Sequence, residues 1–406
     1  MHSGRRMKIL MTTSTFPFRQ GDGQARFILD LAMALSTTAT VTVISPHAPG
    51  SPTHETIDGV TVRRFRYFIP VSLQRLAYGA GMRHNLDRSW LARAQVPCLM
   101  AAQVLAQSWS VVRDRPSVIN AHWLIPQGLT AAVVARIFRV PLVVHVHAAD
   151  VYFLQRLRFG PALARFVVQT SATILADGSH VHDALDALIG GESGARLRPM
   201  GVWVRHFQGR EGNRSPSDDL PPRFVAFVGR LVEKKGVEYL IRAMVSIREQ
   251  EPGLELVVVG DGPLEIQLME LSRELGLEPF IHFMGYRGHE DVAFLLRESD
   301  VACVPSVIDS KGETDGMPTV VLEAMAAGAR VVGSAVDGIP DVLRDTENGW
   351  LVEPADPSSL AEGILSALSS GQGDAISAAG VLTAEEHDWP AVAREYQRVL
   401  GEAARA

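Results

Sequence analysis

Two basic residues in the second half of the sequence have side chains suited to holding a phosphate group. Arg230 ends the apolar run FVAFVGR, and Lys235 stands just before a glycine and a segment with helical spacing. A guanidinium binds phosphate through two parallel hydrogen bonds, an ammonium acts as a point charge, and a helix N-terminus adds positive potential. We therefore predict a diphosphate site here, with Lys234 facing solvent. The alternative is a solvated basic turn.

An acidic residue inside an apolar segment indicates a second binding position. Residues 310–328 read SKGETDGMPTVVLEAMAAG, in which Pro318 is suited to a first helical turn and Gly328 to a helix stop. The helix between them is apolar on nearly every side, so we expect it to be buried. It contains Glu323, and a buried carboxylate is costly unless it is hydrogen-bonded. Glu323 therefore needs a partner from the protein or from a ligand.

Imidazole, indole and carboxylate groups occur at two successive strand ends in the first half. NAHWLIPQG places His122 and Trp123 at one end, and HVHAAD places His147 and Asp150 at the next. Such groups hold sugar hydroxyls or transfer protons near neutral pH. A packing role is the alternative for each histidine. We expect no metal site, on the assumption that His145 and His147 point to opposite faces of their strand.

Glycine pairs follow two further apolar runs. Gly21 and Gly23 precede a helical segment whose N-terminus could face an anion or a sugar hydroxyl, although a plain tight turn is the alternative. This loop is neither a P-loop nor a dinucleotide-binding fingerprint. Gly260 and Gly262 are predicted to let backbone approach a ligand closely.

The elements that must position these residues are short β-rich runs, each followed by a helical segment. The runs are MKILMTTS, TVTVIS, SVINAHW, PLVVHVHAAD and ATILADG, and then RFVAFVGRL, LELVVVGDG, IHFMGY, DVACVPS, ARVVGSAV and GWLVEP. Continuous apolar strands separated by helices indicate parallel sheets covered on both faces. The chain is therefore predicted to be α/β, with two Rossmann-like domains facing across a cleft. Ligands bind beyond the carboxyl ends of such strands.

Length and local composition predict the domain boundaries. A chain of 406 residues exceeds what one hydrophobic core usually serves. Residues 208–222 are polar, charged and proline-rich, which is typical of a linker. We assign residues 1–207 to the first domain, residues 223–387 to the second, and residues 388–406 to a helix that packs back towards the first.

Charge and cysteine content exclude several classes of protein. A net charge of -6 argues against a nucleic-acid binder. Cys98 and Cys303 are the only cysteines, so neither a disulfide framework nor a thiolate metal site is indicated. From the sequence we expect neither a secretory signal nor a membrane-spanning segment. We expect a cytoplasmic protein, with the inner face of the cell membrane as an alternative location.

One stretch of the first half has the composition of a membrane-surface segment. Residues 59–95 mix many arginines with aromatic and aliphatic residues, and Asp87 is their one acid. Such a patch could contact an anionic membrane and reach a lipid-linked acceptor. The alternative is an ordinary solvated pair of helices beside an acceptor cleft.

Seven motifs, taken in order, resemble the retaining GT-B-fold glycosyltransferases of family four. They are TFPF…GDGQARF, NAHWLIPQG, HVHAAD, PMGVWVRHF, VGRLVEKKG, VVVGDGP and DGMPTVVLEAMAAG, and they cover nearly the whole chain. The resemblance implies a GT-B fold and transfer of a sugar from a nucleotide-diphosphate sugar to a hydroxyl acceptor. It also implies retention of anomeric configuration, no required metal or other cofactor, and a role in cell-surface polysaccharide or glycolipid assembly.

The resemblance also implies roles for individual residues. Arg230 and Lys235 would hold the donor diphosphate, and Glu323 would bind the ribose diol. The family has a second acid, separated from this one by seven residues, near the transferred sugar. Counting back places that acid at Asp315, where the family usually has Glu, and leaves Glu313 as a nearby rival.

Further positions follow the family less closely. His147 corresponds to a histidine near the donor sugar, although Ala148 replaces the usual glycine. PMGVWVRHF carries Met200 and Trp203 where Asn and Asp are common. The family places backbone amides near the sugar and phosphate, here from Gly316, Met317, Pro318 and Thr319.

Two other functions remain open from the sequence. A nucleotide-sugar epimerase can use the same two-domain fold, and His122, His147 and Asp150 could serve its proton transfers. A sugar-nucleotide-binding protein without activity is the other alternative.

Overall fold

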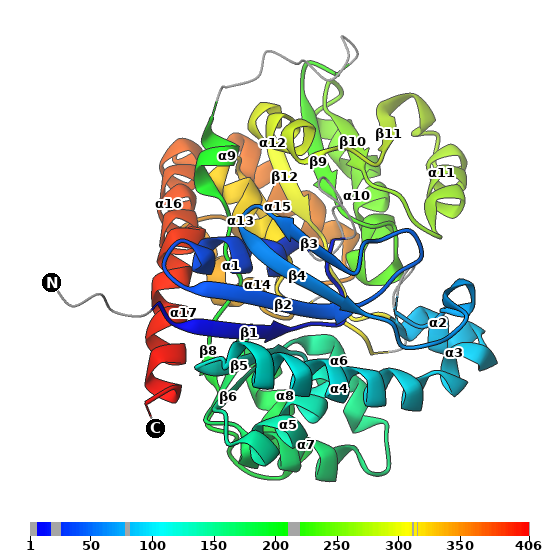
Figure 1. The fold of residues 1–406 in the computed structure, drawn as a ribbon. Helices are drawn as coiled ribbons and strands as arrows, with labels where there is room; N and C mark the ends of the chain where they lie inside the picture. Colours follow the sequence, from blue (N-terminus) through cyan, green and yellow to red (C-terminus); the bar gives the residue numbers. More distant parts are fainter. Residues whose placement is uncertain are drawn as a thin grey trace, which may run out of the picture. The chain divides into compact units, whose positions relative to one another are not determined.

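The computed structural model describes residues 6–17, 26–77, 82–209, 220–310, 312–314 and 316–405 (Figure 1). Gly21, Gly23 and Asp315 lie outside these residues, so their predicted roles stay predictions. The chain forms two compact units, one made of Met1–Pro199 with Pro390–Ala406 and the other of Met200–Trp389. The sequence placed the linker at 208–222, a few residues after the division between the units.

The first unit is built on an eight-stranded sheet with the strand order β3-β4-β2-β1-β5-β6-β7-β8. Its neighbouring strands pair in parallel except β3 with β4, which are antiparallel. The strands are β1 (Lys8–Thr12), β2 (Thr40–Pro46), β3 (His54–Ile57), β4 (Val60–Phe65), β5 (Val118–His122), β6 (Leu142–Val146), β7 (Thr173–Ala176) and β8 (Arg196–Leu197).

Helices pack around this sheet because their apolar faces need cover. They are α1 (Arg26–Ser36), α2 (Met82–Arg88), α3 (Trp90–Ala94), α4 (Val96–Asp114), α5 (Leu129–Phe138), α6 (Ala148–Gln155), α7 (Gly160–Thr170), α8 (Ser179–Ile189) and α17 (Trp389–Ala403), with short turns η1 (Val71–Leu73) and η2 (Leu124–Gly128). Every residue of β5 and β6 is buried, as expected of central strands covered on both faces.

The C-terminal helix α17 belongs to the first unit. Its Tyr396 is fully buried and its hydroxyl is hydrogen-bonded to Nδ1 of His145 on β6. Two ion pairs join α17 to the segment of β8, Arg198 with Glu395 and Arg196 with Glu402. The helix is therefore fixed by both burial and charge.

The second unit contains a six-stranded, fully parallel sheet with the order β11-β10-β9-β12-β13-β14. Its strands are β9 (Phe224–Val228), β10 (Glu255–Val259), β11 (Ile281–Gly285), β12 (Val301–Val304), β13 (Val331–Ser334) and β14 (Trp350–Val352). Its helices are α9 (Val204–Gln208), α10 (Val237–Gln250), α11 (Glu265–Glu274), α12 (His289–Glu298), α13 (Thr319–Ala326), α14 (Ile339–Val342), α15 (Pro357–Ser369) and α16 (Gly373–Glu386), with turns η3 (Glu233–Lys235) and η4 (Glu278–Phe280).

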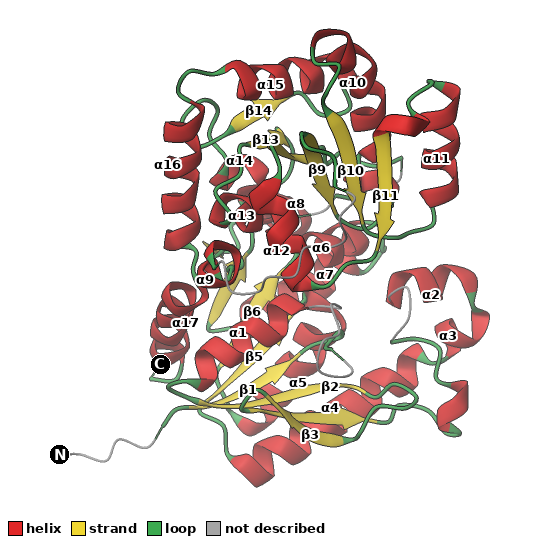
Figure 2. Cartoon of the chain, turned by 90° about the horizontal axis from the view of Figure 1, so that it is seen from above, coloured by secondary structure: helices red, strands yellow, loops and turns green. Residues whose placement is uncertain are grey.

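Successive side chains of β9 pack in two different apolar clusters of the second unit. Ala226 packs in one apolar cluster, whereas Val225 and Phe227 pack in another. Successive side chains of a strand point to opposite faces, so each cluster covers one face of the sheet. Figure 2 shows helices on both sides of this sheet. The predicted Rossmann-like architecture, with parallel sheets covered on both faces, is confirmed for both units.

All eleven predicted strands are present, but β3, β4 and β8 were missed. The stretch 59–95 does not form only a pair of helices, because it begins with β4. Two of its arginines are engaged within the fold: Arg63 pairs with Asp114, and the buried Arg64 pairs with Glu55. Those two charges are therefore not available to a membrane surface.

Candidate active site

The predicted phosphate-binding residues lie on one turn after β9. Arg230 is exposed two residues beyond the strand, and Lys235 is half-buried at the end of η3. The next residue, Gly236, has φ 66°, and a Cβ there would lie 1.7 Å from the carbonyl oxygen of Pro305. Only glycine fits this position, so the backbone fixes where Lys235 stands relative to the start of α10.

The glycines after β10 allow two strand-end loops to pack backbone against backbone. A Cβ on Gly260 would lie 1.9 Å from the oxygen of Gly229, and one on Gly262 would lie 2.4 Å from the oxygen of Leu231. The nitrogen of Gly229 donates to Val259 at 2.9 Å. These glycines therefore allow a close backbone approach, but what they approach is the loop after β9. The predicted ligand contact of these glycines stays a prediction.

Lys234 does not face solvent as predicted. Its Nζ donates to the carbonyl of Thr314 at 2.9 Å, and its own carbonyl accepts from the nitrogen of Val307 at 2.9 Å. The neighbouring Glu233 accepts from the nitrogen and the hydroxyl of Ser310 at 2.7 and 2.8 Å. The prediction was wrong because the loop after β12 supplies a carbonyl partner that lies about 80 residues away in sequence. The η3 turn thereby fastens this loop.

The acid-containing loop before α13 is tied to itself. The nitrogen of Glu313 donates to a carboxylate oxygen of Asp309 at 2.7 Å, and the nitrogen of Asp309 donates to the carbonyl of Glu313 at 2.9 Å. Gly316 has φ 72°, and its carbonyl accepts from Gly338 at 3.1 Å. Pro318 then caps α13, without a side-chain hydrogen bond, and Thr319 is the first helical residue.

Helix α13 is buried, as the sequence predicted. Val321, Leu322, Ala324 and Met325 are fully buried, and Glu323 is half-buried among them. The helix therefore carries its acid at the margin of the core, on the element that follows the loop fastened by η3.

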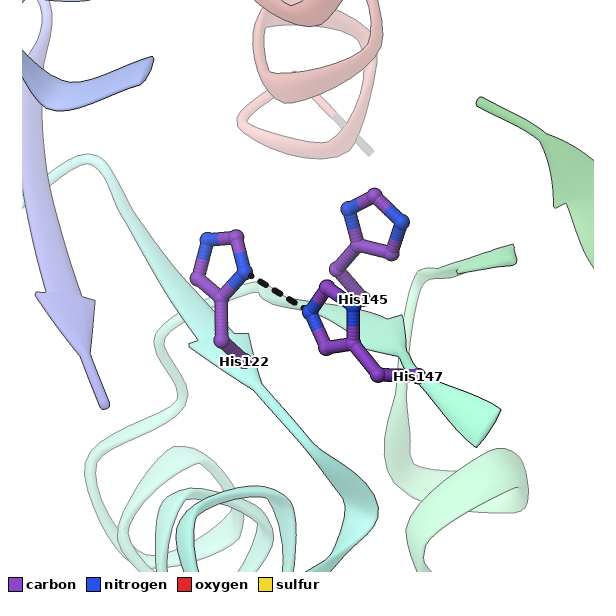
Figure 3. A group of neighbouring side chains, drawn as sticks. All are labelled: His122, His145 and His147. Carbon is purple, nitrogen blue, oxygen red and sulfur yellow. Dashed lines mark hydrogen bonds between the residues drawn. The ribbon is translucent and has the colours of Figure 1, made fainter. Parts of the chain in front are cut away.

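A row of buried polar groups spans the strand ends of the first unit (Figure 3). Nδ1–H of His147 donates to Asp177 at 3.0 Å, and Nε2 of His147 lies 3.3 Å from Nδ1 of His122. His145 joins the group by stacking on His147, and its Nδ1 is hydrogen-bonded to the hydroxyl of Tyr396 on α17. Sequence reasoning missed Asp177, His145 and Tyr396. Asp177 directly follows β7, so the strand-end rule that selected His122 would also have found it.

The assumption that His145 and His147 point apart was wrong. Residues two apart in an extended strand share a face, and the two rings stack with centroids 4.7 Å apart and an interplanar angle of 16°. Ring nitrogens of His122, His145 and His147 lie within 4.8 Å of one another. A tetrahedral zinc site needs lone pairs that converge on one point. The ring of His147 is nearly parallel to those of His122 and His145, which fits a stack of hydrogen-bonded imidazoles and not such a site.

Burial sets the charge of this group. Desolvation lowers the pKa of His122 and of His145 well below the usual value, and the neighbouring His147 lowers both further. Desolvation raises the pKa of Asp150 to about 7, although His147 and the backbone N–H of Leu124 oppose the shift. The imidazoles of His122 and His145 are therefore neutral at neutral pH.

Asp150 clamps two loops and does not reach outward. Its two carboxylate oxygens accept from the backbone nitrogens of Leu124 and of His147, the latter at 3.2 Å. Its exposed fraction is 4%. The carboxylate thus joins the loop after β5 to the end of β6, which makes it a positioning group for Trp123 and His147.

Trp123 has a strained backbone. Its φ is 71° and its ψ is 141°, a combination that large side chains avoid. The backbone nitrogen of Trp123 donates to the backbone carbonyl of His145 at 2.8 Å. The centroid of its indole ring lies 4.9 Å from that of the His147 ring. Such strain costs about 1–3 kcal/mol and persists only where the surroundings impose it, most often at functional sites. The structure thus brings together His122, Trp123, His147 and Asp150, as the strand-end pattern predicted.

Comparison with known proteins gives consistent results for both units. The family model "Glycosyl transferase 4-like domain" matches residues 22–203, and "Glycosyl transferases group 1" matches residues 211–379. An uncharacterized glycosyltransferase of Methanocaldococcus jannaschii is 27% identical over 89% of each chain. The amylovoran biosynthesis glycosyltransferase AmsK of Erwinia amylovora is 34% identical, over 38% of each chain.

Solved structures share the fold over nearly the full length. Sucrose-phosphate synthase from Thermosynechococcus elongatus superposes with a TM-score of 0.74 at 20% identity, covering 98% of this chain and 99% of that one. HepE from Anabaena superposes with a TM-score of 0.71 at 18% identity, covering 98% and 100%. With the two family matches, the likeness supports one conclusion: the chain belongs to the group 1 glycosyltransferases and is an enzyme with the GT-B fold.

Proposed function

We propose that the enzyme transfers a sugar from a nucleoside-diphosphate sugar to a hydroxyl acceptor, with retention of anomeric configuration. The observation that carries the proposal is the η3 turn of the second unit. It presents Lys235 beside the strand end that bears Arg230, and through Glu233 and Lys234 it fastens the loop that leads to Glu323. A diphosphate-binding turn and an acid-bearing helix are thereby joined within one unit.

Solved relatives support the class of donor. HepE from Anabaena has been solved in complex with UDP and with UDP-glucose. In our proposal Arg230 and Lys235 hold the diphosphate, and Glu323 accepts from the ribose diol. The backbone of residues 316–319 lies near the sugar and phosphate, where every residue but Pro318 has an N–H to donate. Asp315 lies near the transferred sugar.

The proposed mechanism is electrostatic. Cleavage at the anomeric carbon builds negative charge on the departing diphosphate, and Arg230 and Lys235 stabilise that charge. The acceptor attacks from the side of the leaving group, and the diphosphate takes the acceptor proton. No metal is required for this step. By the family resemblance, His147 is proposed as the histidine near the donor sugar.

The names of relatives support the proposed biological role. AmsK acts in amylovoran biosynthesis by its name, and WcaL of Escherichia coli, 33% identical over 40% of this chain, is named for colanic acid biosynthesis. We propose a role in cell-surface polysaccharide or glycolipid assembly, in the cytoplasm or at the inner face of the membrane. Within the described residues, no helix is both long and apolar enough to cross a bilayer.

A thermal-shift screen tests the proposed donor. A ligand bound only by the folded state raises the melting temperature, so a nucleotide sugar of the right class stabilises the enzyme. The R230A/K235A double variant should lose the shift, whereas R242A, which removes an exposed arginine of α10, should keep it. Equal shifts in all three proteins would refute the diphosphate site.

Donor turnover without acceptor separates the proposal from the epimerase alternative. A transferase leaves the donor sugar largely intact until a hydroxyl acceptor is added, whereas an epimerase converts it alone. A protein that binds the donor but never transfers its sugar to any polysaccharide or lipid acceptor supplied would match the inactive alternative.

A further inference from the structure

Helix α4 of the first unit presents an apolar stripe to solvent and keeps polar side chains inside. Gln103 and Gln107 are fully buried, and both donate to the hydroxyl of Thr12, at 3.2 and 3.1 Å. Leu105, Trp109 and Val112 are instead 70%, 65% and 59% exposed. The exposed residues recur at helical spacing: Pro97, Cys98, Ala101, Leu105, Trp109, Val112 and Arg113. A helix of a water-soluble surface normally has the opposite pattern.

An apolar groove runs beside this stripe, between α4 and α5. Its volume is about 560 Å³, and Met100, Val104 and Leu105 of α4 line it together with Leu129 and Val133 of α5. One lining residue is polar, Thr130, and its hydroxyl already accepts from Gln107 at 3.1 Å. The groove thus offers hydrocarbon contact without unsatisfied hydrogen bonds.

The same unit exposes further apolar side chains next to arginines. At the end of α5, Ile137 is 64% and Phe138 is 37% exposed, between Arg136 and Arg139. Phe159, before α7, is 70% exposed, and α7 packs against α5. Apolar side chains flanked by basic ones are typical of surfaces that enter the headgroup region of a bilayer.

The charge of this part of the chain is opposite to that of the whole. Residues 88–176 contain nine arginines and two acids, in a chain with a net charge of -6. Of the two acids, Asp114 is shared between Arg63 and Arg113, and Asp150 is buried. Basic residues at a surface attract anionic lipid by about 1 kcal/mol each.

We propose that the face formed by α4 and the end of α5 docks on an anionic bilayer, with Leu105 and Trp109 in the interface and a lipid acyl chain in the groove between α4 and α5. This rests on the membrane location in the proposed function and deepens it by naming the surface that docks, and docking itself requires no donor and no turnover. It also differs from the sequence expectation, which placed the membrane contact at residues 59–95. Sedimentation measures docking separately from transfer, so either claim can fail alone.

Sedimentation with vesicles tests the apolar stripe. Vesicles of phosphatidylcholine with phosphatidylglycerol should sediment the enzyme, and L105S and W109S should each weaken binding about tenfold, since each loses a large buried apolar side chain. The matched control is I266S, because Ile266 is a comparably exposed residue, at 71%, on the second unit. Binding equal to wild type in L105S and W109S, with unchanged melting temperature, would overturn the proposal.

Charge and insertion are tested separately. R136S/R139S should reduce binding about tenfold on anionic vesicles and have little effect on phosphatidylcholine alone, whereas R242S/R273S, on the second unit, should bind like wild type. Lipids brominated on the acyl chain should quench wild-type fluorescence more than that of W109F, which keeps an aromatic side chain. If vesicles never bind and W109S instead converts a dimer to a monomer, the face joins two copies and the proposal is wrong.

Discussion

At the scale of single residues, Lys235 is the most direct test of the leaving-group site. We expect K235A to lower turnover by about 100-fold or more, because loss of one preorganised charged donor in the transition state has an effect of that order. Steady-state kinetics would show the change in kcat, and the melting temperature should stay close to that of wild type. R242A controls for loss of a surface cation. Turnover near that of wild type would remove Lys235 from the site.

Glu323 tests the ribose contact at the same scale. E323Q keeps the size of the side chain but removes its charge, and charged hydrogen bonds contribute about 1.5–3 kcal/mol. We expect the donor Kd to rise about tenfold or more, measured by calorimetry with the nucleotide sugar. If the free energy of unfolding falls while the donor Kd is unchanged, Glu323 serves the fold and not the ligand.

At the scale of elements, a substitution at Gly236 can displace the turn between β9 and α10 without removing any charged side chain. In G236A the new Cβ would lie 1.7 Å from the oxygen of Pro305, at a φ of 66°. We expect a loss of about 2 kcal/mol or more in the free energy of unfolding, together with reduced turnover. G253A is the matched control, because a Cβ there meets nothing within 4 Å. Urea denaturation and kinetics measure both effects.

At the scale of the whole molecule, α17 joins the end of the chain to the first unit, and one of its ion pairs depends on pH. The hydrogen bond from Arg398, with the charge of Arg198, lowers the pKa of Glu395 to about 2, against the opposing effect of burial. A carboxyl whose pKa is lowered by folding stabilises the native state above its unfolded pKa, near 4.5, and loses that effect as the pH falls towards 2.

We therefore expect E395Q to be less stable than wild type by about 1 kcal/mol at pH 7, a small value because the side chain is partly solvent-screened. The difference should shrink as the pH falls towards 2. Denaturant titrations at pH 7 and at acid pH measure it, with E385Q, an exposed acid of α16, as control. A constant difference at all pH values would contradict the assignment.

Sequence alone determined eleven of the fourteen described strands, the ends of those strands and the order of motifs. Runs such as FVAFV and LVVHV can be recognised as strands without knowing which helices pack on them. A strand inside a parallel sheet is covered on both faces, so nearly all of its side chains are apolar. Ligands of such sheets bind beyond the carboxyl ends of the strands, which is why His122, His147, Arg230 and Lys235 could be chosen as candidates from the sequence.

Tertiary structure decided which polar groups are partnered within the protein. Asp150 was a predicted ligand contact, but its oxygens hold the backbone of Leu124 and His147. Lys234 was expected in solvent, but it binds a carbonyl about 80 residues away. Likewise, the outward apolar face of α4 is apparent only once its glutamines are seen to bond to Thr12. Hydrogen-bond partners distant in sequence are set by how elements pack, and local sequence pattern does not specify that packing.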